Sequence, residues 1–124
     1  MSYWIVFLGA GIGGACRHGV NQWVLRLLGS GFPFGTLIIN IVGSCLMGLV
    51  AGYFALRGEA PQAVRLFLTT GILGGFTTFS AFSLDAALLY ERGQFAAALG
   101  YAFGSVVLSI LGLFLGLFVV RQIS

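Results

Sequence analysis

Residues 74–83 read GGFTTFSAFS, and they lie inside a run that extends from Leu66 to Leu84 without a charge. A glycine pair followed by two threonines is a poor helix sequence, because glycine costs about 1 kcal/mol relative to alanine in a helix interior. Irregular backbone at membrane depth is tolerated only where it is buried in protein or lines a cavity. The stretch therefore predicts a membrane helix broken at its middle, with backbone groups available to contact ions.

The composition of the whole chain indicates that lipid surrounds most of it. Of 124 residues, 59% are hydrophobic and 7% are charged, and the mean hydropathy is +1.05. A soluble domain carries about 25% charged residues, because its surface faces water. The net charge of +3 comes without a single lysine. It fits membrane anchoring better than a nucleic-acid surface, so we expect membrane lipid and no nucleic acid as a partner.

Four apolar stretches are long enough to cross about 30 Å of hydrocarbon. They predict an all-α membrane protein with one domain over residues 1–124. The expected spans are 3–28, 34–56, 62–90 and 95–120. Short turns at 29–33, 57–61 and 91–94 would join them. The first span is the least regular, because Arg17 and His18 follow its apolar part.

The arginines give this arrangement no preferred orientation. Four spans would place three arginines on each side of the membrane: Arg57, Arg65 and Arg121 on one, and Arg17, Arg26 and Arg92 on the other. The positive-inside rule then favours neither orientation of the chain in the membrane. A chain that inserts both ways round can pair with itself in an antiparallel arrangement.

Two polar stripes occur at four-residue spacing, one in the second span and one in the fourth. They are Thr36, Asn40 and Ser44, and Tyr101, Ser105 and Ser109. Such a stripe is often a hydrogen-bonded packing seam between helices. It also offers O–H and N–H donors without a fixed charge, which suits a small anion that must shed water. Spacing alone leaves both interpretations open.

Phe79 and Phe82 share one face of the third span, three residues apart. Such a pair is usually apolar bulk in a core or against lipid. The edge of a phenylalanine ring is electropositive, however, and can face an anion.

Several other functions find little support. His18 is the single histidine, Asp85 has no paired carboxylate at a useful spacing, and no nucleotide-binding motif occurs, so we expect no enzyme. A small multidrug-type proton antiporter is the alternative transporter, but it needs a carboxylate in its first helix, and residues 1–28 contain none. A non-transporting assembly subunit, with the stripes serving only as helix contacts, stays open.

Three motifs together resemble the Fluc (CrcB) family of fluoride channels. They are GGFTTFSAF at 74–82, GTLIIN at 35–40, and Arg17 after a glycine-rich first helix. The resemblance covers essentially the whole chain. It implies a dual-topology antiparallel homodimer in the inner membrane, with two fluoride pores and a structural sodium ion at the dimer axis. It also implies passive export of fluoride from the cytoplasm.

The resemblance also implies roles for individual residues. The pore would contain Asn40, Phe79, Phe82, Tyr101, Ser105 and Ser109, with Thr36 on the same stripe as Asn40. Arg17 would lie in the vestibule, and the backbone carbonyls of Gly74 and Thr77 would hold the sodium. Two positions depart from the family pattern: relatives often have Glu in place of Asp85 and Thr in place of Leu113.

Overall fold

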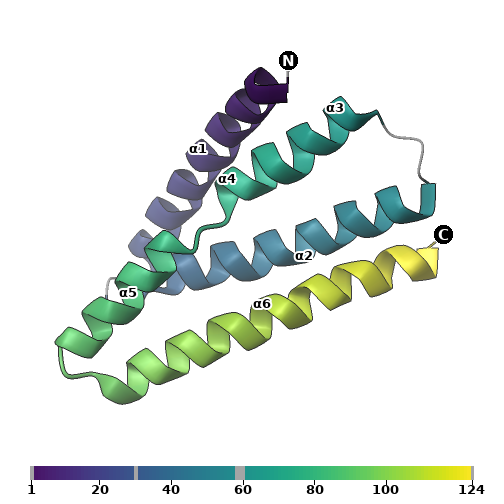
Figure 1. Ribbon diagram of the computed structural model, residues 1–124. Helices are drawn as coiled ribbons and strands as arrows, with labels where there is room; N and C mark the ends of the chain where they lie inside the picture. The colour runs from purple at the N-terminus through teal and green to yellow at the C-terminus, as the bar shows by residue number, and fades with distance from the viewer. Residues whose placement is uncertain (1, 30, 58–60, 124) are drawn as a thin grey trace.

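The computed structural model describes residues 2–29, 31–57 and 61–123, and all regular structure in these ranges is helical. The elements are α1 (Ser2–Leu28), α2 (Phe34–Arg57), α3 (Gln62–Arg65), the π-helix η1 (Leu66–Leu73), α4 (Gly74–Phe76), α5 (Ser80–Glu91) and α6 (Phe95–Ile123) (Figure 1). The expectation of an all-helical protein is confirmed. The turns expected at 29–33 and 57–61 include residues 30 and 58–60, which lie outside the described residues.

Three of these segments are long and apolar enough to cross a membrane. They are Phe34–Ala55, Gln62–Glu91 and Phe95–Ile123. Helix α1 has 27 residues, but it is not among the three. Its second half carries Arg17, His18 and Arg26, which lower its hydropathy. That residues 3–28 cross the bilayer therefore stays a prediction.

Helices α2 and α6 lie side by side over most of their length (Figure 1). Their backbones approach so closely that a Cβ at Gly116 would overlap the Cys45 carbonyl, and a Cβ at Gly48 would overlap the Leu113 carbonyl. Small residues permit such contacts between membrane helices, where van der Waals packing replaces the hydrophobic effect. Gly48 and Gly52, which continue the four-residue spacing of the second-span stripe after Ser44, therefore form a packing seam with α6.

Helix α1 packs against η1 and α4 in the same manner. A Cβ at Gly13 would overlap the Ile72 carbonyl, so the two chains touch through backbone atoms. In a π-helix the hydrogen bonds run to the fifth residue, and its wide turns are rare and often found near functional sites. Here the π-helical turns of η1 bring the chain to the start of α4.

Regular helix stops at Phe76 and resumes at Ser80. Thr77 is extended, with φ −82° and ψ 158°, whereas Phe79 has returned to helical angles of −94° and −33°. Figure 1 shows the chain turning between α4 and α5, where Asn40 and Gly43 in the first half of α2 contact it. We call residues 77–79 the α4–α5 junction. The depth at which it lies in a bilayer remains a prediction.

The surface is strongly apolar. The outer face of α6 exposes the large side chains of Phe103, Phe114 and Phe118, and the first turns of α1 expose Tyr3 and Trp4. Water-soluble monomers rarely leave apolar patches of this extent uncovered. The folded chain therefore needs lipid or another protein against most of its surface.

Candidate functional site: a neutral groove at the α4–α5 junction

The side chain of Asn40 is hydrogen bonded to the main chain of Thr78. The Asn40 Nδ2 donates to the Thr78 carbonyl at 3.0 Å, and the Thr78 N–H donates to the Asn40 Oδ1 at 3.0 Å. The amide thus bonds to the N–H and to the carbonyl of one residue, which belong to the two peptide groups on either side of Thr78. An asparagine amide nitrogen has two hydrogens, so one N–H of Asn40 is left for another acceptor.

The two threonines of the junction also bond to the main chain. The Thr77 hydroxyl donates to the Leu73 carbonyl at 3.0 Å, which is the same acceptor that the Thr77 N–H uses. The Thr78 hydroxyl accepts the Ala81 N–H at 3.2 Å. Threonine oxygens satisfy backbone groups in this manner at the first turn of a helix. Thr78 therefore caps α5 while it holds Asn40.

These bonds divert the usual helical donors of two carbonyl groups. In an uninterrupted α-helix, the N–H groups of Thr78 and Ala81 would donate to the carbonyls of Gly74 and Thr77, four residues earlier. In this structure they donate to the side chains of Asn40 and Thr78. Gly74 and Thr77 are the two residues expected to offer carbonyl oxygens to a cation. Within residues 2–29, 31–57 and 61–123, no cluster of three His, Cys, Asp or Glu side chains could hold a metal.

A groove of about 470 Å³ opens beside the junction. It is lined by α2, α6 and the chain from α4 to α5, through Asn40, Gly43, Ser44, Met47, Gly74, Thr77, Thr78, Phe79, Phe82, Ser105, Val106, Ser109 and Leu113. Among the described residues that line it, none is charged. The groove therefore offers neutral donors on apolar walls, with Leu113 supplying hydrocarbon.

Two hydroxyls of α6 face this region without a partner. The Oγ atoms of Ser105 and Ser109 are buried, and neither has a hydrogen bond within the described chain. Ser105 is 4% exposed. A buried polar atom that stays unpaired typically costs about 1–3 kcal/mol, so such atoms call for an explanation in a ligand, an ion or water. These two line the same groove as Asn40.

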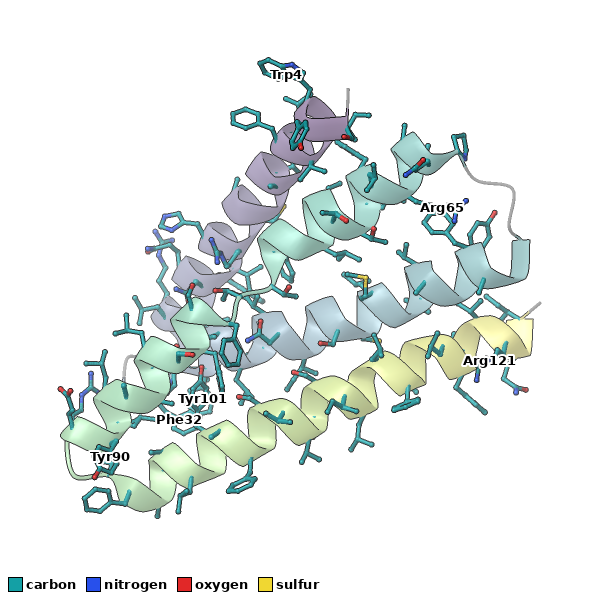
Figure 2. The ribbon with its side chains drawn as sticks, in the orientation of Figure 1. Trp4, Phe32, Arg65, Tyr90, Tyr101 and Arg121 are labelled. Carbon is teal, nitrogen blue, oxygen red and sulfur yellow. The ribbon has the colours of Figure 1, made fainter. Side chains whose placement is uncertain are left out.

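An aromatic file runs from the groove toward the other end of α5. The ring centroids of Phe79 and Phe82 lie 5.5 Å apart, and those of Phe82 and Tyr101 lie 5.2 Å apart. Phe32 then meets Tyr101 edge-on, at 5.5 Å and 90° (Figure 2). Phe79 is 76% exposed, so the chain's own packing leaves most of this ring uncovered.

Tyr101 contacts Phe82, which lines the groove, and Asp85, which lines a second, smaller pocket of about 180 Å³. Its hydroxyl donates to the Asp85 carboxylate, with 3.2 Å between Oη and Oδ2. The second pocket is lined by Thr36, Asp85 and Arg92, among others, and so carries both signs of charge. Thr36 is buried there rather than in the groove.

The structure thus brings five of the expected pore residues into one groove: Asn40, Phe79, Phe82, Ser105 and Ser109. Tyr101 contacts Phe82 of the groove, and Thr36 lines the second pocket. Arg17 lines neither space. Sequence reasoning missed Thr78, which holds Asn40 and caps α5. The local signal was the threonine pair directly after the glycine pair, because threonine at a helix start commonly caps it.

Comparisons with known proteins agree on one family. The model of the CrcB-like protein, Camphor Resistance (CrcB), family matches residues 4–117. The Fluoride-specific ion channel FluC 2 of Nitrobacter hamburgensis is 58% identical over the full length of both chains. The FluC channel of Rhodopseudomonas palustris (strain BisB5) is 59% identical, also over both full lengths. That of Methylobacterium nodulans is 65% identical over 95% of this chain and 94% of its own. Taken with the three apolar helices, these likenesses indicate an integral membrane protein.

Proposed function

This chain belongs to the CrcB-like family, and from that premise we propose that it forms a fluoride-selective channel through which fluoride leaves the cytoplasm passively. Family membership was expected from residues 74–82, 35–40 and 17, and it is confirmed. The relatives are named fluoride-specific ion channels, which are not enzymes. This agrees with the absence of a catalytic constellation expected from the sequence.

The observation that carries the proposal is the neutral groove with two unpaired buried hydroxyls. Fluoride is small and tightly hydrated, so a narrow path must replace its water with other donors. Ser105, Ser109 and the remaining N–H of Asn40 supply such donors. A fixed positive charge would hold the anion too firmly, whereas hydroxyl and amide donors bind it and release it.

The rings of Phe79 and Phe82 form the apolar wall of the same path. Their edges carry partial positive charge and can approach an anion without a formal charge. Chloride is larger and fits a narrow file less well. Tyr101 and Thr36 extend the file beyond the groove, and Arg17 draws anions to the vestibule by its charge.

We further propose that two copies pair antiparallel in the inner membrane, each chain contributing to two pores. The exposed Phe79 ring and the open side of the groove support a second copy as the cover. Arg65 and Arg121 lie at the end of the bundle away from Tyr90 (Figure 2), and Arg92 follows α5 at the opposite end. Charges at both ends support insertion in either direction.

A structural sodium ion fits the residues at the junction. The carbonyls of Gly74 and Thr77 lose their helical donors to side chains, and a hard cation prefers oxygen ligands. Two such carbonyls from each copy would hold it at the dimer axis. When bound, sodium supplies a positive charge that holds the two junctions together.

Fluoride efflux from proteoliposomes tests the channel directly. Vesicles loaded with potassium fluoride and purified protein are given valinomycin, and external fluoride is followed with a selective electrode. We expect rapid fluoride release and no chloride release from matched chloride-loaded vesicles. Equal release of both anions would contradict selectivity. No release of either would favour an assembly subunit. Drug-dependent proton movement would favour the antiporter, although no carboxylate is among the described residues of the groove.

A further inference from the structure

The N–H of Thr78 has two possible acceptors. One is the Gly74 carbonyl, four residues earlier, which it would reach in an uninterrupted α-helix. The other is the Asn40 Oδ1, which it reaches in this structure at 3.0 Å. One hydrogen cannot serve both acceptors well. The choice between them decides whether the Gly74 carbonyl is free.

The Asn40 side chain is better placed than the Gly74 carbonyl to accept this hydrogen. It accepts from the Thr78 N–H and also donates to the Thr78 carbonyl, at 3.0 Å in each case. This two-point pair holds the peptide groups on both sides of Thr78 and also fixes the orientation of the amide. No other described side chain bonds to the Thr78 main chain, and Asn40 lies 38 residues away on α2. The junction is therefore held open by a neighbouring helix.

From this competition we propose that Asn40 is a positioning residue for the cation site: by holding the Thr78 peptide, it keeps the Gly74 carbonyl oxygen available to sodium. The inference rests on the proposed function, because it takes the sodium site from there. It gives Asn40 a second task beside the groove. The Oδ1 and one Nδ2 hydrogen maintain the junction, and the other Nδ2 hydrogen remains for fluoride.

The variant Asn40→Ala tests the positioning task. In Asn40→Ala the Thr78 N–H has lost its acceptor and returns to the Gly74 carbonyl. Ser44→Ala is the matched control, because Ser44 lies one turn away on the same stripe and lines the same groove.

The test is sodium-dependent thermal stability of the purified dimer, followed by intrinsic fluorescence in a buffer with N-methyl-D-glucamine as the replacing cation. We expect the unfolding temperature of the wild type and of Ser44→Ala to rise with sodium at similar concentrations. For Asn40→Ala the half-maximal sodium concentration should rise about tenfold, the effect of one competing hydrogen bond. An unchanged value for Asn40→Ala, or no sodium response in the wild type, would overturn the proposal.

A second variant covers the case in which Asn40→Ala folds poorly. Replacing residue 78 by the α-hydroxy analogue of threonine removes the competing N–H and keeps the side chain, but it also makes the Thr77 carbonyl a weaker ester oxygen. The reference is therefore the ester with Asn40 intact, and adding Asn40→Ala to it should leave the half-maximal sodium concentration unchanged. A further tenfold rise on adding Asn40→Ala would overturn the proposal. Fluoride efflux is measured separately: absent wild-type efflux with an Asn40-dependent sodium response defeats the proposed function alone.

Discussion

Asn40 shows how one side chain in the groove can be required for two reasons. It pairs with the Thr78 peptide through both of its polar atoms, and one N–H remains unused. An aspartate in its place keeps an acceptor, but it removes every donor and adds a charge of the same sign as the permeant ion. Among the described groove residues that charge would have no counter-ion.

We therefore predict that Asn40→Asp abolishes fluoride efflux while the protein remains a folded dimer. The measurement is fluoride release from vesicles, with size-exclusion chromatography of the same preparation to verify assembly. Repulsion between two unit charges about 4 Å apart is about 4 kcal/mol near a protein surface, which corresponds to a loss of about a thousandfold. Normal efflux from this variant would remove Asn40 from the path.

The variant Ser105→Ala provides a second test, because we expect it to affect stability and activity differently. The Ser105 hydroxyl is buried and has no partner in the described chain. Ser105→Ala removes an unsatisfied group, so we expect the free energy of unfolding to stay equal or to rise. Fluoride efflux should fall by about tenfold, the value of one lost hydrogen bond to the ion.

Denaturation of the reconstituted Ser105→Ala protein, compared with its efflux rate, decides between two roles for the hydroxyl. A loss of stability with unchanged efflux would mean that it serves only to join helices. Ser105→Thr keeps the hydroxyl and is the matched control for the efflux rate.

At the scale of elements, the pairing of α2 with α6 depends on backbone contact. A Cβ at Gly116 would overlap the Cys45 carbonyl, whereas a Cβ at Gly104, on the same helix, meets nothing within 4 Å. We predict that Gly116→Ala destabilises the protein by about 1–3 kcal/mol, the usual cost of overpacking. Gly104→Ala should leave the free energy of unfolding of a single chain unchanged. The measurement is unfolding in mixed micelles, and equal stability of both variants would contradict this packing.

The stripes explain what the sequence could predict and what it could not. Hydropathy identified the long helices, because lipid imposes length and apolar composition on each. The four-residue spacing of Asn40, Ser44 and Gly48 is the same throughout, yet the structure uses Gly48 for packing and Asn40 for the junction. The difference arises from where α6 and the α4–α5 junction meet α2. That is a property of three elements together, which no local pattern contains.

The role of Thr78 was not predicted from the sequence, for a related reason. Its main chain bonds to a residue 38 positions away, and hydrogen-bonding partners at such separation leave no periodic signal. Arg17 was expected in a vestibule, but it lines neither pocket of the single chain. Its role in a vestibule stays a prediction for the proposed dimer.

At the scale of the whole molecule, the proposed antiparallel pair requires that each copy can insert in either direction. Gln122 lies in the last turn of α6 and is exposed, so a cysteine there reports which side of the membrane the C-terminal end occupies. Cys16 and Cys45 are free thiols, and both are first replaced by serine. A membrane-impermeant maleimide is then added to cells carrying Gln122→Cys. Because the arginines give no bias, about half of the copies should react before permeabilisation and the rest only after it.

The contrasting control carries additional arginines in the α5–α6 turn, for example Gln94→Arg, which should shift labelling toward one side and reduce fluoride efflux as antiparallel pairs become scarce. If nearly all copies of the unaltered chain react from a single side, the antiparallel pair is wrong. The open side of the groove would then need a cover other than an inverted copy of this chain.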